Sequence, residues 1–148
     1  MNRYETADFY HKQGYNCAQS VVWAFENDLP FPVEQALNAT SGFGFGAGMG
    51  EMCGAVVGAV AVLGLMYPVD PADPVGSKKR TMGHGKIVQT QFKEQFRHLR
   101  CHDLLQDPSS PSEATPAAVS LGITKHCDLM IVTAVELVEK FLKEQGKI

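Results

Sequence analysis

The sequence predicts an all-α protein, folded as a single compact bundle-like domain of about five or six helices with a glycine-rich loop. No segment of the 148 residues shows the strict alternation of apolar and polar residues that marks a half-buried strand. Several segments instead repeat apolar residues every three to four positions, as amphipathic helices do. The hydrophobic content of 45% is enough for a buried core, so we expect residues 1–148 to form one domain.

The first three helices are expected before residue 40. Residues 4–12 form a short helix that Gly14 ends. Asn16 is a favourable N-cap for a second helix over residues 17–26, because its side chain can accept from an unpaired backbone N–H. After a turn, Pro32 suits the first position of a third helix that runs to about Ala39.

A glycine-rich loop and an apolar helix follow. Between Gly42 and Gly50 every second residue is glycine, which raises the entropy cost of ordering the backbone and suits a place of close approach. The apolar run from Cys53 to Tyr67 has 15 residues, whereas a membrane span needs about 20. We therefore expect a core helix and no membrane span, although its small residues would also suit a homodimer interface.

The second half of the chain is expected to hold two long helices and two proline-rich surface loops. The first loop covers residues 68–74, and a helix with a core-facing stripe begins near Lys78. The second loop covers residues 107–116. Thr124 can then cap a last helix over residues 125–144.

Charge and composition narrow the function classes. A net charge of −3 indicates neither a nucleic-acid-binding protein nor one that binds anionic membranes. The basic run from Lys78 to Lys86 is typical of a solvated helix start, and it would also suit docking of an acidic redox partner. The first 17 residues lack the apolar core of a signal peptide, so we expect a cytoplasmic protein.

Four cysteines are the strongest functional signal, namely Cys17, Cys53, Cys101 and Cys127. Their gaps of 35, 47 and 25 residues include no C-x-x-C pair, so the usual zinc-ribbon, ferredoxin and thioredoxin motifs are absent. All but Cys101 fall near predicted helix N-termini, where the macrodipole favours a thiolate. Cys101 is expected late in a helix, with Arg97 one turn before it. If the four thiolates converge, a positive centre is needed to make their charges tolerable.

The cysteine contexts resemble the C_GCAxxG_C_C family. The first motif runs Gly14-Tyr15-Asn16-Cys17-Ala18-Gln19, and the second runs Cys53-Gly54-Ala55-Val56-Val57-Gly58. Cys101 stands before the pair Leu104 and Leu105, and Cys127 opens the last helix. The resemblance implies a redox-active protein, similar to the iron–sulfur portion of split-Soret cytochromes c. The chain has no C-x-x-C-H motif, so no covalently attached haem is expected.

The leading hypothesis is therefore an iron–sulfur cluster held by Cys17, Cys53, Cys101 and Cys127, for electron transfer or redox sensing. The backbone at Gly50 and Gly54 would approach the cluster closely, and the redox partner protein is unknown. His102 and His126 adjoin cysteines, so either could support or replace a ligand.

Two alternatives stay open. One is a metal-free thiol–disulfide oxidoreductase in which Cys17 and Cys53 cycle between dithiol and disulfide. The other is a zinc-bound structural module. The sequence does not decide whether the protein is an enzyme.

Overall fold

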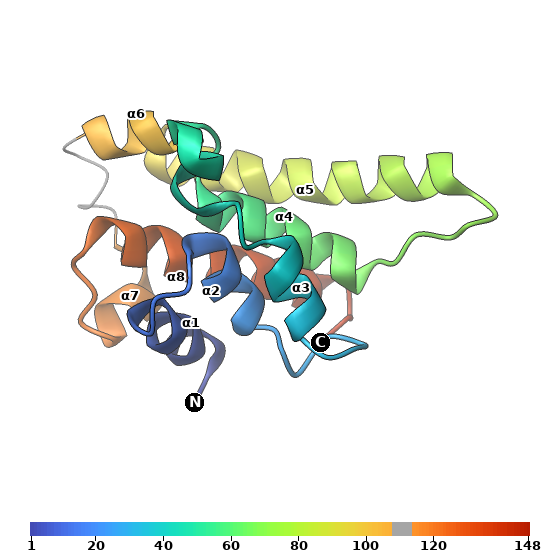
Figure 1. The fold of residues 1–148 in the computed structure, drawn as a ribbon, viewed down its shortest axis with the longest axis horizontal. Coiled ribbons are helices and arrows are strands. Elements are labelled where there is room, and N and C mark those ends of the chain that lie inside the picture. Colours follow the sequence, from blue (N-terminus) through green and yellow to red (C-terminus); the bar gives the residue numbers. More distant parts are fainter. Residues whose placement is uncertain (108–113) are drawn as a thin grey trace.

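The computed structural model describes residues 1–107 and 114–148, and it confirms the all-α prediction (Figure 1). In these ranges the only strand-like pairing is an isolated bridge between Met52 and Arg100. The elements in chain order are α1 (Arg3–Lys12), α2 (Cys17–Trp23), α3 (Glu34–Ala39), the wide turn η1 (Gly46–Gly50), α4 (Gly54–Met66), α5 (Pro74–Phe96), α6 (Cys101–Gln106), α7 (Pro116–Ser120) and α8 (His126–Glu144).

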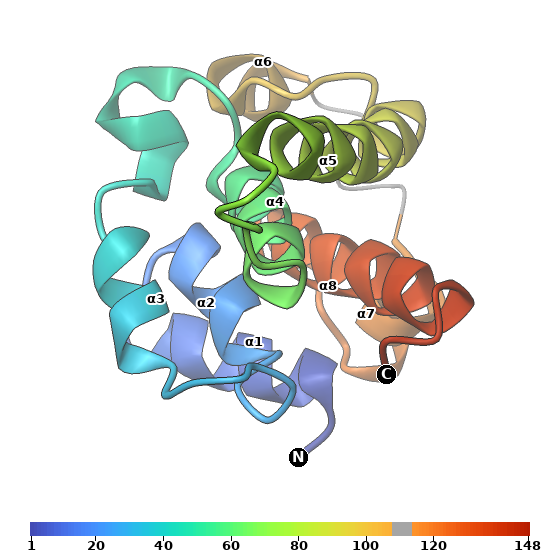
Figure 2. The ribbon, with the colours of Figure 1, turned by 90° about the vertical axis from the view of Figure 1, so that its right-hand side faces the viewer.

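Helix α4 lies at the centre of the molecule, where it packs against α2, α5 and α8 (Figure 2). Its small residues let α2 approach at backbone distance. A Cβ atom at Gly58 would lie 2.7 Å from the carbonyl oxygen and 2.8 Å from the Cα atom of Ala18. The small face of α4 is therefore filled by α2.

None of the helices in the described parts of the chain is both long and apolar enough to cross a membrane.

Helix α8 has the expected amphipathic pattern, and Ile131, Val135 and Val138 are fully or almost fully buried. The prediction that Thr124 is its N-cap is wrong. The backbone of Lys125 is still extended, so Lys125 is the N-cap and the helix begins one residue later than the periodicity predicted.

Three other helix boundaries also differ from the prediction. Helix α5 begins at Pro74 and not near Lys78, because the Asp73 carboxylate accepts from the Gly76 N–H at 2.9 Å and proline is tolerated in a first helical turn. Helix α3 begins at Glu34, two residues after Pro32. Helix α2 ends at Trp23 and not at residue 26.

The second expected loop, over residues 107–116, includes residues 108–113, which lie outside the described parts. Its last residue, Pro116, opens the short helix α7, which the sequence analysis did not predict. The side chain of Thr115 caps this helix by accepting from the Ala118 N–H at 3.5 Å.

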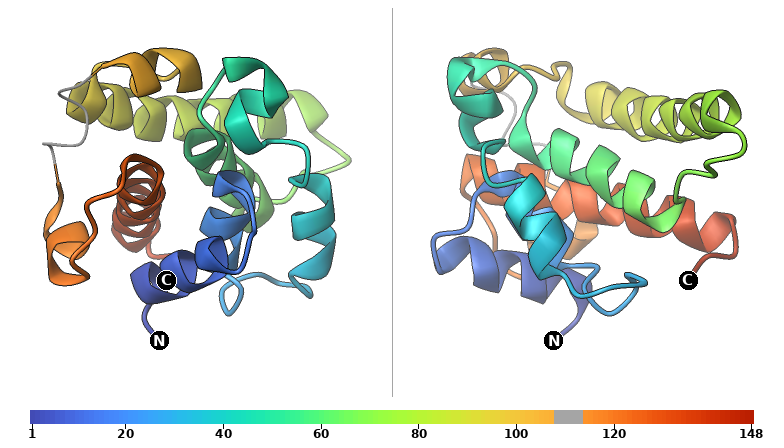
Figure 3. Two further views of the ribbon diagram at one scale, coloured as in Figure 1. Left: turned by 60° about the vertical axis from the view of Figure 1, so that its left-hand side comes forward. Right: turned by 45° about the vertical axis from the view of Figure 1, so that its right-hand side comes forward.

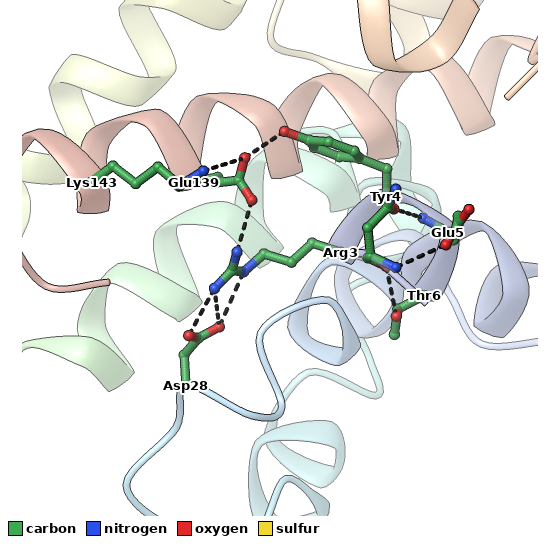
Figure 4. Close-up of polar contacts among 8 residues, drawn as sticks. Arg3, Tyr4, Glu5, Thr6, Asp28, Glu139 and Lys143 are labelled. Atoms are coloured by element: carbon green, nitrogen blue, oxygen red, sulfur yellow. Dashed lines mark hydrogen bonds and ion pairs between the residues drawn. The ribbon is translucent and has the colours of Figure 1, made fainter. Parts of the chain in front are cut away.

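A charged cluster ties α1 to α8 and to the segment that follows α2 (Figure 4). The Arg3 guanidinium donates to Asp28 and to Glu139, each at 2.8 Å. Glu139 also accepts from the Tyr4 hydroxyl at 2.5 Å and pairs with Lys143 at 3.3 Å. Because Arg3, Asp28 and Glu139 are mostly shielded from water, the cluster fixes the N-terminal helix on the body of the protein.

Candidate functional site: four cysteines around an apolar cavity

One cavity brings all four cysteines together. It has a volume of about 120 Å³ and lies where α2, α4, α6 and α8 begin. It is lined by Cys17, Phe45, Cys53, Gly54, Cys101, Leu104, Leu105, His126, Cys127 and Met130. The convergence that the sequence could only suggest is therefore present in the fold.

Each cysteine stands at the start of a helix, as predicted for three of them. Cys17 is the first residue of α2, after an Asn16 cap whose side chain accepts from the Gln19 N–H at 2.8 Å. Cys53 is the N-cap of α4, and Cys127 is the second residue of α8. At the start of α4, the backbone N–H groups of Ala55 and Val56 donate to the Cys53 sulfur.

The expected position of Cys101, late in a helix, is wrong. Helix α5 ends at Phe96, and Arg97 takes a left-handed conformation with φ 70°. The chain is then extended at Arg100, so Cys101 opens the new helix α6. Arg97 is therefore not one turn before Cys101 on a shared helix.

A short backbone clamp joins the second and third cysteines. The Cys53 N–H donates to the Leu99 carbonyl at 2.7 Å, and the Cys101 N–H donates to the Glu51 carbonyl at 2.6 Å. The Arg100 guanidinium adds an ion pair with the Glu51 carboxylate at 3.2 Å. This clamp holds two sites that are almost 50 residues apart in the sequence against each other.

The glycine-rich loop reaches the cavity in a left-handed conformation. Phe45, Gly46, Ala47 and Gly48 all have positive φ, between 50° and 74°. Such values cost about 1–2 kcal/mol for each non-glycine residue, so the two non-glycine positions are strained. A Cβ atom at Gly46 would lie 2.3 Å from the Glu51 nitrogen, which explains why only glycine fits there.

The two glycines predicted near the cofactor occupy different places. Gly54 lines the cavity, and a Cβ atom there would lie 3.1 Å from the Cβ atom of Cys17. Gly50 has φ 69°, and a Cβ atom there would lie 3.3 Å from the Cβ atom of His102 on α6. Gly54 therefore belongs to the cavity wall, whereas Gly50 shapes the contact between η1 and α6.

Burial has the largest effect on the pKa of two of the four thiols, Cys53 and Cys101. Burial raises the pKa of Cys53 to about 12, although the N–H groups of Ala55 and Val56 act in the opposite direction. Burial likewise raises the pKa of Cys101. Helix N-termini were expected to favour thiolates, but at Cys53 the desolvation cost outweighs the backbone donors.

Cys17 and Cys127 form a hydrogen-bonded thiol pair. Donation from Cys17 stabilises the Cys127 thiolate and lowers the pKa of Cys127 to about 7. The positive charge of nearby His11, which contacts Asp128 at 2.7 Å, acts in the same direction. The same hydrogen bond, together with burial, raises the pKa of Cys17, because its proton holds the pair together.

Alkylation of the metal-free, reduced protein should follow these values. Thiol reactivity rises with pH as the thiolate fraction grows, so Cys127 should react with a half-maximal rate near pH 7. Cys53 should react much more slowly than Cys127, because it is 5% exposed and its pKa is about 12. Mass spectrometry of iodoacetamide-treated protein over a pH series measures each site. A Cys127 midpoint at or above the ordinary thiol pKa of about 8.5 would contradict the expected order.

The cysteine motifs included Leu104 and Leu105 of the apolar lining but did not identify Phe45 or Met130. Met130 follows Cys127 by three residues and therefore shares its helix face, which is a signal that periodicity could have used. Phe45 carried no such signal, because the alternation of glycine in this loop does not indicate which side chains face a cavity. His126 does line the cavity, and burial lowers its pKa. His102 points outward, with 61% of its side chain exposed.

Comparison with known proteins gives one match. A family model described as "Putative redox-active protein (C_GCAxxG_C_C)" matches residues 15–141, a range that includes all four cysteines. No curated protein and no solved structure matches the chain.

Proposed function

Since this chain belongs to the C_GCAxxG_C_C family of redox-active proteins, we propose that it holds an iron–sulfur cluster for electron transfer or redox sensing. The proposed ligands are Cys17, Cys53, Cys101 and Cys127. The observation that carries the proposal is that these four thiols, from four different helices, line one apolar cavity. Four cysteine thiolates are the usual ligand set of such clusters.

The cavity suits a group larger than a single ion. Its volume of about 120 Å³ is several times the 10–15 Å³ or so that one water molecule needs. Within residues 1–107 and 114–148, no three His, Cys, Asp or Glu side chains are grouped to hold one metal ion. A cluster with several irons accepts thiolates spread around it, so these observations favour a cluster over mononuclear zinc.

The residues around the four thiols would influence the reduction potential of a bound cluster. When bound, the cluster supplies one-electron chemistry. The N–H groups of Ala55 and Val56 donate to the Cys53 sulfur, and hydrogen bonds to sulfur are one way a protein sets a cluster's potential. Phe45 and Leu105 line the cavity yet are 58% and 47% exposed, so the wall next to the solvent is thin at these two side chains.

A second function is favoured by the thiol pair. In a metal-free protein, the Cys127 thiolate can attack a disulfide substrate, and Cys17 can then resolve the mixed disulfide. The substrate is reduced to two thiols while Cys17 and Cys127 form a disulfide. The hydrogen bond between Cys17 and Cys127 makes them a better candidate for the redox-active pair than Cys17 and Cys53. The pairing of Cys17 with Cys53 stays an untested prediction.

Protein purified without oxygen tests the cluster proposal. We expect brown protein with matched iron and acid-labile sulfide. Replacing each cysteine by serine in turn should remove most of the iron, because a ligand is lost in every case. Met130→Leu is the matched control, since Met130 lines the same cavity without a thiol. This variant should keep its iron.

The same measurements separate the alternatives. Zinc without iron would support the structural module. Colourless, metal-free protein after attempted reconstitution would favour the thiol pair, and mapping of the disulfide would show which cysteines join. If all four serine variants kept wild-type iron and colour, the cluster proposal would be wrong.

A further inference from the structure

The charges of the chain are strongly segregated. Helix α5 contains five of the 13 lysine and arginine residues but only one of the 16 acidic residues, Glu94. Its formal charge is therefore +4 in a chain whose total is −3, so the rest of the chain carries −7. A single helix thus presents a positive surface on an otherwise acidic protein, and such a surface selects partners by charge.

Three of these cations form a line that we call the lysine ridge: Lys79, Lys86 and Lys93. Successive members are seven residues apart, which is two helical turns or about 10.5 Å. The opposite side of α5 is buried through Val88 and Phe92, each 1% exposed. Because α5 lies on the outside of the molecule and packs on α4 and α8, the ridge faces solvent (Figure 3).

The ridge lysines have free charges. No ion pair joins Lys79, Lys86 or Lys93 to any side chain in the described ranges. Arg80 on the same helix differs, because its guanidinium donates to the carbonyls of Tyr67 and Pro68 at 2.8 and 2.9 Å. Arg80 is thus used within the fold, whereas the ridge is available to a partner.

Apolar side chains share the ridge face. Val75 and Met82 lie at helical spacing from Lys79 and Lys86, and they are 56% and 66% exposed. Exposed methionine adapts to varied contacts and is enriched at interfaces. The face therefore combines apolar contact area with unpaired positive charge.

One end of the ridge lies close to the thiol site. Helix α6 lies beside the C-terminal end of α5 (Figure 1). A surface groove of about 420 Å³ runs along this end and is lined by Lys86, Gln89, Thr90, Lys93 and Leu99. The carbonyl of Leu99 accepts from the Cys53 N–H at 2.7 Å. A partner seated in the groove would contact a residue that is hydrogen-bonded to a cavity cysteine.

We propose that the lysine ridge docks the acidic face of an electron-carrier protein, which exchanges electrons with the thiol site. The carrier role of the partner rests on the proposed function, but the charge recognition does not. Nucleic acid fits less well, because the positive charge of the ridge is confined to one helix of an acidic chain, whereas a duplex carries negative charge along its whole length. An anionic membrane fits less well too, because the aromatic residues of α5, Phe92 and Phe96, are buried and cannot insert.

A plant-type ferredoxin, an acidic electron carrier, is the probe for this proposal. Its binding to the full chain is measured by NMR titration at about 0.05 M and about 0.5 M salt, where screening is weak and strong. We expect shifts confined to α5, α6 and the 97–100 segment, and weaker binding at high salt. The double variant Lys79→Glu with Lys86→Glu should weaken binding at least about tenfold. The control, Lys12→Glu with Lys140→Glu, makes the same charge change on α1 and α8 and should bind within about twofold of wild type.

Three results would overturn the proposal. They are equal binding by the two double variants, no binding of the ferredoxin at low salt, and tighter binding of a short DNA duplex or phosphatidylserine vesicles. Failure here is distinguishable from failure of the cluster proposal. The ridge variants should keep wild-type iron, and the serine variants should keep the binding.

Discussion

Gly58→Ala is expected to destabilise the metal-free protein by about 3 kcal/mol, because overpacking at a backbone contact has no flexible side chain to absorb it. The new methyl group would lie 2.7 Å from the Ala18 carbonyl oxygen and 3.1 Å from the Cβ atom of Val21. Helices α2 and α4 must then separate. Because Cys17 precedes Ala18 directly, the separation should also move Cys17 away from Cys53 and lower the iron content of the loaded protein.

Guanidinium unfolding, followed by circular dichroism, measures the effect. Gly83→Ala is the matched control, because Gly83 is also in a helix but a Cβ atom there would meet nothing within 4 Å. Alanine has the higher helix propensity, so this variant should gain about 1 kcal/mol. A Gly58→Ala protein as stable as wild type would show that the close packing of α2 on α4 is not required.

Glu139→Gln is expected to cost about 2 kcal/mol, because charge-assisted hydrogen bonds are the strong ones and three donors converge on this carboxylate. The donors are Arg3 at 2.8 Å, Tyr4 at 2.5 Å and Lys143 at 3.3 Å, and the side chain of Glu139 is 15% exposed. Glu144→Gln is the control on the same helix. It changes an exposed carboxylate and should stay within about 0.5 kcal/mol of wild type.

The cost of Glu139→Gln should depend on pH. Burial alone would raise the pKa of Glu139, but the hydrogen bonds from Tyr4, Arg3 and Lys143 outweigh it, so the folded pKa lies below the ordinary value of 4.5. The stabilisation is then complete above pH 4.5 and is lost as the pH falls through the folded pKa. Urea unfolding of both proteins over a pH series should show the gap closing below pH 4.5. A gap that widened on acidification would contradict this sign.

The sequence predicted those parts of the fold that local signals control. The Asn16 cap, the central apolar helix and the stripe of α8 are all short-range patterns, and each is present. The errors also have local causes. The Asp73 cap lets α5 begin at Pro74, at the end of a segment with three prolines that was expected to be a loop. The left-handed conformation of Arg97 ends α5 at Phe96, so Cys101 lies at the start of α6 and not at the end of α5.

The site could be predicted only in part, because its assembly depends on long-range contacts. The cysteine contexts predicted which thiols would matter. They did not predict the clamp between residues 51–53 and 99–101, nor that burial would keep the Cys53 thiol neutral. Both depend on which helices meet in space.

The clamp and the cavity also set an order of events in synthesis. Two ligand candidates come from the first half of the chain. Of the other two, Cys101 is part of the clamp and opens α6, and Cys127 follows α7. Cys127 is the second residue of α8, so the cavity lacks one of its four thiols until the start of α8 has left the ribosome. A cofactor held by all four thiols must therefore enter after Cys127 has been made, and a nascent chain truncated before α8 should fail to retain it.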